Sequence, residues 1–216
     1  MSSIKSVVIS CAGIGSRLGL GQTKALITVN GKSLIAWQLE LFKDVEDIRV
    51  VIGYQANDVV QEVLRYRQDV IFVYNHRYFE TKTGASFFLG AQHANEYVLE
   101  WDGDLLVHPD DVKKILETDD EFICYAEKSS EEAVFVHTNE AGEVLAFSRE
   151  SGDYEWTGPA CIKRKNLNYT SNNVFNQLEP YLPMRGMKVR AYDIDTYQDY
   201  IKVSAIVSSW DVDKNS

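Results

Sequence analysis

The chain has little cysteine. Its 216 residues include three cysteines, Cys11, Cys124 and Cys161, which are widely separated and lack the spacing of metal ligands. This pattern argues against a disulfide framework and a cysteine-based metal centre. We expect three buried thiols in a reducing compartment, and therefore a cytoplasmic protein.

Long hydrophobic runs are also lacking. The first apolar run, VVIS at 7–10, is short and is followed by glycines, which is typical of a buried strand and not of a signal peptide. No run approaches the length of a transmembrane helix. The sequence therefore predicts no membrane insertion.

Basic residues are in the minority, because 22 Lys and Arg stand against 32 Asp and Glu. Such a chain lacks the positive surface with which proteins bind the phosphates of DNA or RNA, so we expect no nucleic-acid partner. An anionic small molecule would need a local cationic pocket or a metal ion.

The first half of the chain alternates short apolar runs with segments of helical periodicity. The apolar runs lie at 7–10, 50–53, 70–75 and 97–101, and the helical segments at 34–41, 58–66 and 85–93. An alternation of this kind predicts βαβ units and a parallel sheet.

The second half is less regular. It predicts helices at 109–117, 171–180 and 196–207, and strands at 122–128, 133–138, 144–148, 158–163 and 187–194. Linkers and repeats are not evident. We predict one domain over residues 1–216 of the α/β class, with a Rossmann-like three-layer α/β/α fold around a mixed, mostly parallel central sheet.

A glycine-rich segment, CAGIGSRLGLGQTKAL, follows the first apolar run. Its glycines let backbone N–H groups approach an anion. A dinucleotide fingerprint would need a small residue at Leu18, and a Walker A loop ending at Lys32 would need glycine at Leu26, so neither motif fits. Arg17 and Lys24 remain as cations that can neutralise a triphosphate and stabilise a leaving pyrophosphate. A surface turn with two solvated cations fits the composition equally well.

The string A-G-x-G-S-R-L-G, followed by T-K-A-L and N-G-K-S-L-I, resembles the signature of the sugar nucleotidyltransferase superfamily. The resemblance implies a Rossmann-like fold, with Arg17 and Lys24 as the catalytic cations on the phosphates. It also implies that the loop binds a nucleoside triphosphate, through Ala12, Gly13, Gly15, Ser16, Arg17 and Lys24. Thr23 stands where the family usually has proline.

Two pairs of carboxylates follow apolar strands, Asp102 with Asp104 and Asp193 with Asp195. Asp-Gly is also a common turn, and Asp195-Thr196 resembles a helix cap. In the resembled family, Gly-Asp and Ile-Asp-Thr at these places supply magnesium ligands. The resemblance therefore implies Asp104 and Asp195 as Mg²⁺ ligands, with Asp102 by the nucleotide and Asp193 by the acceptor as helpers that bind water or lysine.

The segment 75–88 and the order of the elements resemble phosphocholine cytidylyltransferases and their relatives that act on other small phosphates or phosphonates. This resemblance implies CTP as the nucleotide, with its base near Thr83, Gly84, Ala85 and Ser86. The Asn-Asn that precedes this helix in that family is either replaced by Thr83-Gly84 or missing here. Aromatic and acidic residues on the expected acceptor side can form a cage for an ammonium group or pack in the core: Trp101, Tyr125, Glu155, Trp156 and Asp193.

The expected reaction is transfer of CMP from CTP to a small phosphorylated acceptor, such as phosphocholine or 2-aminoethylphosphonate, with release of pyrophosphate. Three alternatives stay open. They are a hexose 1-phosphate uridylyl- or guanylyltransferase, a molybdenum-cofactor guanylyltransferase-like enzyme of the same fold, and a non-catalytic nucleotide-binding module. A homodimer is compatible with each of them.

Overall fold

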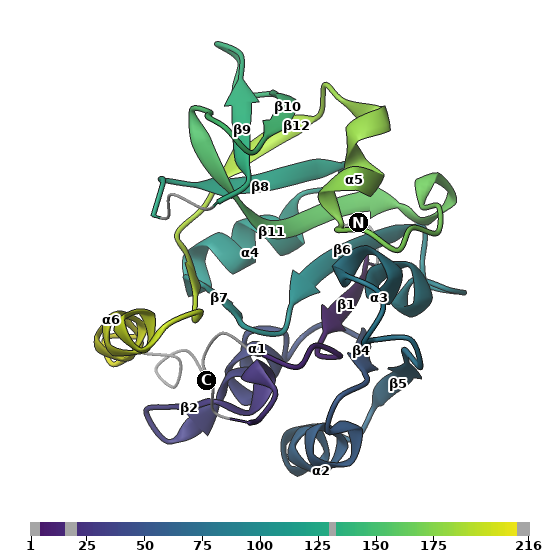
Figure 1. The fold of residues 1–216 in the computed structure, drawn as a ribbon, viewed down its shortest axis with the longest axis vertical. Coiled ribbons are helices and arrows are strands. Elements are labelled where there is room, and N and C mark those ends of the chain that lie inside the picture. The colour runs from purple at the N-terminus through teal and green to yellow at the C-terminus, as the bar shows by residue number, and fades with distance from the viewer. Residues whose placement is uncertain (1–4, 16–20, 130–132, 211–216) are drawn as a thin grey trace.

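The computed structural model describes residues 5–15, 21–129 and 133–210 (Figure 1). Its centre is a nine-stranded sheet in the order β10-β9-β11-β6-β1-β4-β5, with β8 paired to β11 and to β12. Four strands are mutually parallel: β1 (Lys5–Ser10), β4 (Asp47–Ile52), β5 (Val70–Tyr74) and β6 (Tyr97–Asp102). They are the four apolar runs predicted for the first half.

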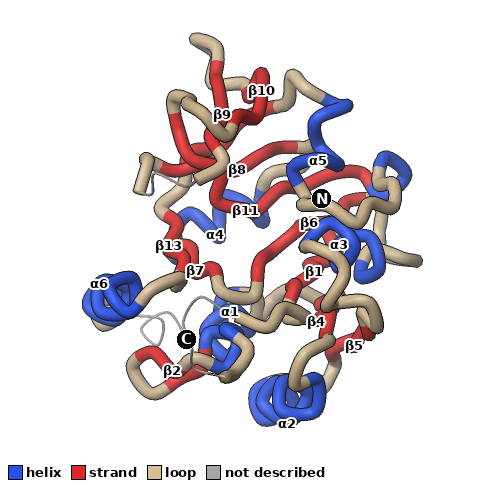
Figure 2. The backbone as a smooth tube through the Cα atoms, in the orientation of Figure 1, coloured by secondary structure: helices blue, strands red, loops and turns tan. Residues whose placement is uncertain are grey.

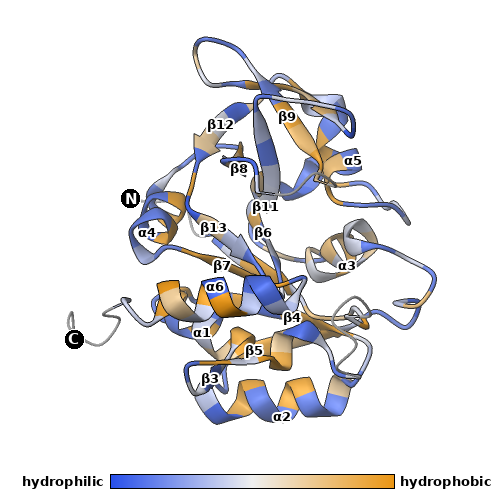
Figure 3. Cartoon of the chain, turned by 60° about the vertical axis from the view of Figure 1, so that its left-hand side comes forward, coloured by the Kyte–Doolittle hydropathy of each residue, from blue (hydrophilic) through white to orange (hydrophobic). Residues whose placement is uncertain are grey.

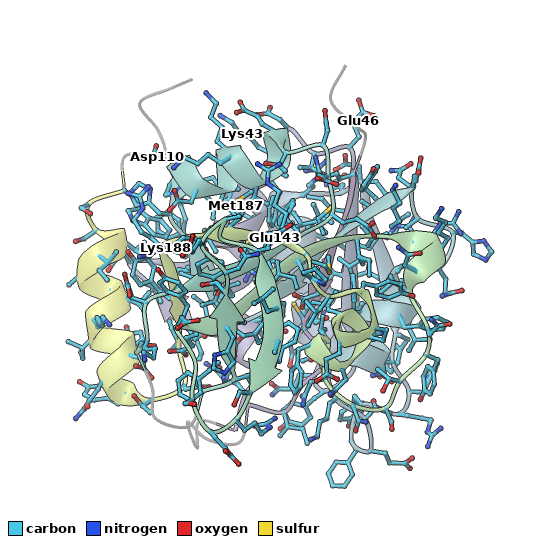
Figure 4. All side chains as sticks on the ribbon, turned by 90° about the horizontal axis from the view of Figure 1, so that it is seen from above. Lys43, Glu46, Asp110, Glu143, Met187 and Lys188 are labelled. Carbon is cyan, nitrogen blue, oxygen red and sulfur yellow. The ribbon has the colours of Figure 1, made fainter. Side chains whose placement is uncertain are left out.

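The remaining strands of the sheet come from the second half of the chain. They are β8 (Phe122–Ala126), β9 (Phe135–Thr138), β10 (Val144–Ser148), β11 (Tyr154–Lys163) and β12 (Arg185–Lys188). Strand β11 runs antiparallel to β6, β8 and β9, whereas β12 is parallel to β8. Met187 of β12 packs against the core and the exposed Lys188 pairs with Glu127; Figure 4 labels both β12 residues. The mixed sheet is confirmed.

Helices cover both faces of the sheet because side chains alternate along each strand. Val7 and Ile9 of β1 face one helix layer, and Val8 faces the other. The first layer holds α1 (Leu34–Leu41), α2 (Ala56–Tyr66) and α4 (Pro109–Glu117), and the second holds α3 (Thr83–Gly90) and α5 (Phe175–Leu178). Figure 3 shows the apolar and polar stripes of α2. The predicted three-layer α/β/α architecture is confirmed.

The last helix, α6 (Tyr197–Val207), packs beside these layers. Its Val203 and Val207 contact α1 and the hairpin formed by β2 (Thr28–Val29) and β3 (Lys32–Ser33). Just before α6, β13 (Ala191–Asp193) pairs antiparallel with β7 (Leu105–Val107), as Figure 2 shows. This pairing brings the C-terminal carboxylates to the end of β6.

Two predicted elements differ from the structure. The helix expected at 171–180 is a four-residue α5 followed by a 3₁₀ turn at Glu179–Tyr181, because Pro180 cannot continue an α-helix. The strand expected at 187–194 is divided into β12 and β13, since Arg190 is held to Asp111 by its backbone N–H and its guanidinium. Two further 3₁₀ turns span Lys24–Leu26 and Arg164–Asn166. No helix in the described part of the chain is long and apolar enough to cross a bilayer.

Candidate active site

A cavity of about 340 Å³ opens at the carboxyl ends of β1 and β6. This edge is where open α/β sheets bind ligands. Its lining includes most of the residues predicted for the nucleotide and its phosphates: Ala12, Gly13, Gly15, Lys24, Thr83, Ser86, Asp102 and Asp104. Ser16 and Arg17 lie outside the described residues. The fold thus brings together three segments that are far apart in the sequence.

Lys24 lies between two of the predicted carboxylates. Its Nζ is 2.5 Å from Asp104 Oδ2 and also donates to Asp195 Oδ1. Burial opposes the charge of this lysine, but the two carboxylates outweigh that effect and raise the pKa of Lys24. Lys24 is therefore a fixed cation at neutral pH, aimed at the floor of the cavity.

Asp195 reaches Lys24 because of the strands that precede it. In the β13–β7 pair, Asp193 lies opposite Leu105, directly after Asp104. The cap of α6 is formed by Thr196 and Asp199, whose side chains bond to each other's backbone N–H groups. The capping role that competed for Asp195 thus belongs to its neighbours, and Asp195 pairs with Lys24.

At two positions near the cavity, neighbouring atoms leave little room for a side chain on the backbone. A Cβ atom on Gly15, whose φ is +67°, would lie 3.0 Å from Lys24 Cγ. One on Gly103 would lie 2.8 Å from the carbonyl oxygen of Ser10 and 2.9 Å from Cys11 Sγ. The positive φ disfavours a side chain at Gly15, and the contacts at Gly103 are closer than a Cβ atom tolerates, so both positions keep the backbone near Lys24 and Asp104.

Thr23, which stands where the family usually has proline, keeps the backbone conformation that proline would impose. Its φ of −63° is the value that proline imposes. Its N–H, which proline lacks, donates to Gln55 Oε1 at 2.8 Å, and Gln55 Nε2 donates to the carbonyl of Gly21. Gln55 therefore ties together both ends of the segment that leads into Lys24.

The carboxyl group of Asp102 lines the same cavity. Burial and the negative charge of Asp104 raise the pKa of Asp102 to about 7, although Lys24 acts in the opposite direction. Burial and the charge of Asp102 raise the pKa of Glu100 well above its ordinary value.

The predicted base contacts divide into two groups. Thr83 and Ser86 line the cavity, whereas Gly84 and Ala85 are buried behind its wall. The N–H of Gly84 donates to the carbonyl oxygen of Asn172 at 3.0 Å, since the segment 170–174 covers the first turn of α3. We therefore remove Gly84 and Ala85 from the candidate base contacts.

A second cavity, of about 650 Å³, lies on the other side of Asp195. Glu155, Trp156 and Asp193, three of the predicted acceptor residues, line it. The other two do not. Trp101 is completely buried against Phe42, and Tyr125 is buried and stacked on Tyr154. Their placement corrects the prediction: both aromatic rings serve the core, because each lies on a strand face that a neighbouring element covers.

Lys82 is a cavity residue that the sequence did not indicate. Its backbone N–H donates to the carbonyl of Ser171, and its side chain has no ion pair within the described residues. Lys24, by contrast, is already neutralised by two carboxylates. A single lysine before a helix has no motif that would identify it, so only the cavity reveals it.

The carboxylate oxygens of the site are suitable ligands for Mg²⁺. The oxygens of Asp104 and Asp195 already converge on a cation, the Lys24 ammonium group, and carboxylate oxygens are the donors that Mg²⁺ prefers. Across residues 5–15, 21–129 and 133–210, no group of three His, Cys, Asp or Glu could hold a metal. Two carboxylates suit Mg²⁺, which takes its other ligands from phosphate and water.

Known proteins resemble the chain along most of its length. Choline-phosphate cytidylyltransferase of Streptococcus pneumoniae (strain ATCC BAA-255 / R6) is 26% identical over 240 aligned residues, which cover 94% of this chain and 98% of that protein. The bifunctional protein GlmU of Sulfurimonas denitrificans is 32% identical over 101 residues, or 46% of this chain and 23% of GlmU.

Solved structures share the fold. The inositol-1-phosphate CTP transferase from T. maritima superposes with a TM-score of 0.79 at 19% identity, covering 100% of this chain and 98% of its own. The CTP:phosphocholine cytidylyltransferase of Streptococcus pneumoniae gives a TM-score of 0.75 at 21% identity. The superposition covers 94% of this chain and 99% of that one. The model of the MobA-like NTP transferase domain matches residues 7–164, from the first strand past Asp104. The chain therefore belongs to the MobA-like NTP transferase family and is a nucleotidyltransferase.

Proposed function

We propose that the enzyme transfers CMP from CTP to a small phosphorylated acceptor that carries a positive charge, and releases pyrophosphate. The observation that carries this proposal is the second cavity. It contains five carboxylates and one lysine among its described lining residues: Glu127, Glu155, Asp193, Asp195, Asp199 and Lys202. Such a wall attracts an ammonium group.

Trp156 adds an aromatic surface to this cavity. Its ring packs edge-on against Phe147, with centroids 5.5 Å apart, which fixes its orientation. A cation over a tryptophan face gains electrostatic energy from the ring. Phosphocholine and 2-aminoethylphosphonate combine an ammonium group with a phosphate or phosphonate, so both match a cavity that joins acids and an indole to Asp195.

The chemistry needs positioning and charge neutralisation more than proton transfer. An ionised acceptor oxygen forms a bond to the α-phosphorus while the bond to the α,β-bridging oxygen breaks. Pyrophosphate leaves with that electron pair, and we assign to Lys24 and Arg17 the stabilisation of its charge. Mg²⁺ held by Asp104 and Asp195 would act as a Lewis acid on the phosphate oxygens.

CTP as the donor is supported by the relatives. The choline-phosphate cytidylyltransferase aligns with 94% of this chain, and a CTP transferase superposes on all of it. A cytoplasmic location is supported by the three cysteines, which are free and buried. One domain and a homodimer stay predictions.

A substrate panel tests the proposal. Pyrophosphate release is measured with CTP, UTP and GTP, each combined with phosphocholine, 2-aminoethylphosphonate or glucose 1-phosphate. Turnover with CTP and a cationic acceptor is the expected result. Turnover confined to UTP or GTP and the sugar phosphate would overturn the proposed specificity, and no turnover with any pair would indicate a nucleotide-binding module.

A further inference from the structure

Helix α1 buries one polar side chain among apolar ones. Gln38 is completely buried. Its neighbours Ile35 and Leu39 pack in the core between α1 and the sheet, and Leu34 and Trp37 pack in the cluster that contains α6. An amide that is taken out of water costs free energy unless hydrogen bonds inside the protein replace those that it loses. Gln38 therefore depends on partners in the interior.

Those partners are two carbonyl oxygens of the turn between β6 and β7. Gln38 Nε2 donates to the carbonyl of Asp102 at 2.9 Å and to that of Leu105 at 2.8 Å. Because carbonyl oxygens only accept hydrogen bonds, the amide nitrogen faces the turn and uses both of its hydrogens there. The amide oxygen accepts no hydrogen bond among the described residues. All the hydrogen bonding of this side chain thus goes to the turn that carries Asp104.

A further bond holds the same turn to β1. The N–H of Gly103 donates to the carbonyl oxygen of Ser10 at 3.0 Å. The backbone of the turn is therefore fixed both to a central strand and to α1. The side chain of Asp104 extends from this fixed backbone and reaches Lys24 Nζ at 2.5 Å. The place of its carboxylate depends on the bonds that hold the turn.

Helix α1 also supports the other partner of this ion pair. The N–H of Leu34, the first residue of α1, donates to the carbonyl oxygen of Ile27 at 2.9 Å. The helix contacts the 3₁₀ turn Lys24–Leu26 as well. Lys24 and Asp104 come from distant parts of the sequence, yet the segments that carry them are both attached to α1.

We propose that Gln38 is a positioning residue for nucleotidyl transfer: its amide holds the turn at 102–105 so that the Asp104 carboxylate stays beside Lys24 and Asp195. A turn without this amide can shift, and a displacement on the order of 1 Å near reacting groups can lower a rate about 100-fold. The inference rests on the proposed function only where it gives Asp104 a part in turnover as a Mg²⁺ ligand.

Replacement of Gln38 by Met tests this role. Methionine has nearly the same length but no donor, so it fills the space in α1 and releases both carbonyls. We expect kcat to fall about tenfold and the Mg²⁺ concentration for half-maximal rate to rise about fivefold, because Asp104 is displaced. The KM for the acceptor should not change. Unchanged kcat and an unchanged Mg²⁺ requirement would overturn the proposal.

A shorter amide gives a milder test that does not depend on the folding of Gln38→Met. Gln38→Asn keeps the donor but lacks one methylene, so it cannot span both carbonyls. Its kcat and Mg²⁺ requirement should lie between those of the wild type and Gln38→Met. Wild-type values in Gln38→Asn would contradict the role of the two hydrogen bonds. The assays use whichever nucleotide and acceptor the substrate panel identifies, so a wrong specificity does not affect them.

Gln177 offers a matched control. It is also buried, its Nε2 donates to the carbonyls of Gly84 at 3.2 Å and Asn168 at 2.8 Å, and its Oε1 likewise has no donor among the described residues. Gln177→Met and Gln38→Met should each lower the melting temperature by about 5 °C, because each removes two hydrogen bonds from the interior. Only Gln38→Met should raise the Mg²⁺ requirement. An equal rise in both variants would show that lost stability is the cause, and would overturn the proposal.

Hydrogen exchange provides a readout that needs neither substrate nor metal. The backbone amides of residues 103–107 should exchange at least about tenfold faster in Gln38→Met than in the wild type, and at the wild-type rate in Gln177→Met. Unchanged exchange in Gln38→Met would show that Gln38 does not hold the turn. If no substrate pair in the panel reacts, the proposed function fails, yet the exchange rates still decide whether Gln38 fixes the turn.

Discussion

Lys24 and Asp195 are 171 positions apart in the sequence and share an ion pair beside the cavity at the carboxyl ends of β1 and β6. The lysine begins a 3₁₀ turn after the glycine-rich segment, and the acid follows the last strand. Because Asp104 binds the same ammonium group, the predicted phosphate-binding cation and the predicted metal ligands form one cluster.

Replacement of Lys24 by Met should reduce kcat by about 100-fold or more, because the leaving pyrophosphate loses a buried cation. Initial rates of pyrophosphate release measure the loss. Lys43→Met is a matched control at an exposed position two residues after the end of α1, labelled in Figure 4, and should retain wild-type rates. Equal rates for both variants would show that Lys24 takes no part in turnover.

Chelation of divalent metal by EDTA should abolish turnover, and Mg²⁺ should restore it. Asp104→Asn and Asp195→Asn should each need at least about tenfold more Mg²⁺ for half-maximal rate, since each loses a charged oxygen ligand. The exposed Asp110→Asn serves as the control. An unchanged Mg²⁺ dependence in both site variants would contradict the assignment.

Lys82→Ala should raise the KM for CTP about tenfold with little change in kcat, because Lys82 lines the cavity without an ion-pair partner among the described residues and can bind a phosphate there. Steady-state kinetics over a range of CTP concentrations measures the effect. Lys82→Arg should restore most of the affinity. A KM for CTP that is unchanged in Lys82→Ala would exclude the contact.

Trp156→Ala should raise the KM for the acceptor about tenfold and leave the KM for CTP unchanged, if the indole binds an ammonium group. Trp156→Phe keeps an aromatic face, so its KM for the acceptor should lie between the values of the wild type and Trp156→Ala. A parallel rise in both KM values would show that Trp156 supports the cavity as a whole.

The Arg190–Asp111 pair should make stability depend on pH. Burial opposes ionisation of Asp111, but hydrogen bonds from Arg190 and Lys114 outweigh burial and lower its pKa. A carboxylate whose folded-state pKa is lowered stabilises the fold above its unfolded pKa of about 4, and this stabilisation is lost as the pH falls below that value.

Arg190→Met should therefore destabilise the protein at pH 7, by about 2 kcal/mol, because the buried Asp111 loses the guanidinium and keeps only Lys114 and the backbone N–H of residue 190 as partners among the described residues. Chemical unfolding at several pH values measures the free energy of unfolding of both proteins. The difference between Arg190→Met and the wild type should become smaller from pH 5 to pH 3. Lys188→Met breaks the exposed pair with Glu127 and should change little at any pH. If Arg190→Met loses the same free energy of unfolding at pH 7 and at pH 3, stability is not linked to the protonation of Asp111.

Local sequence predicted the parts of the site that depend on neighbouring residues. Gly15, Lys24 and Asp104 follow apolar strands at short spacing, so the strand order alone places them at one edge of the sheet. The helix at 109–117 was likewise predicted with its bounds, because Pro109 and the acids after it favour a helix start.

The errors arose where a distant segment decides the environment. Gly84 is covered by the segment 170–174, which no pattern near residue 84 reveals. Trp101 is buried because α1 packs on its face of β6 and Phe42 meets its ring. An aromatic residue on a strand has the same sequence signature whether its face meets a helix or a cavity.

The pairing of β13 with β7 makes the site depend on a late part of the chain. The family model ends at residue 164, yet Asp195, which completes the cluster around Lys24, lies beyond it. During synthesis the glycine-rich segment and Asp104 leave the ribosome long before Asp195 does. A polypeptide interrupted before β13 would lack both the second carboxylate of this cluster and α6, whose Val203 and Val207 pack against α1 and the β2–β3 hairpin, so the cluster around Lys24 is complete only when synthesis has passed the family domain.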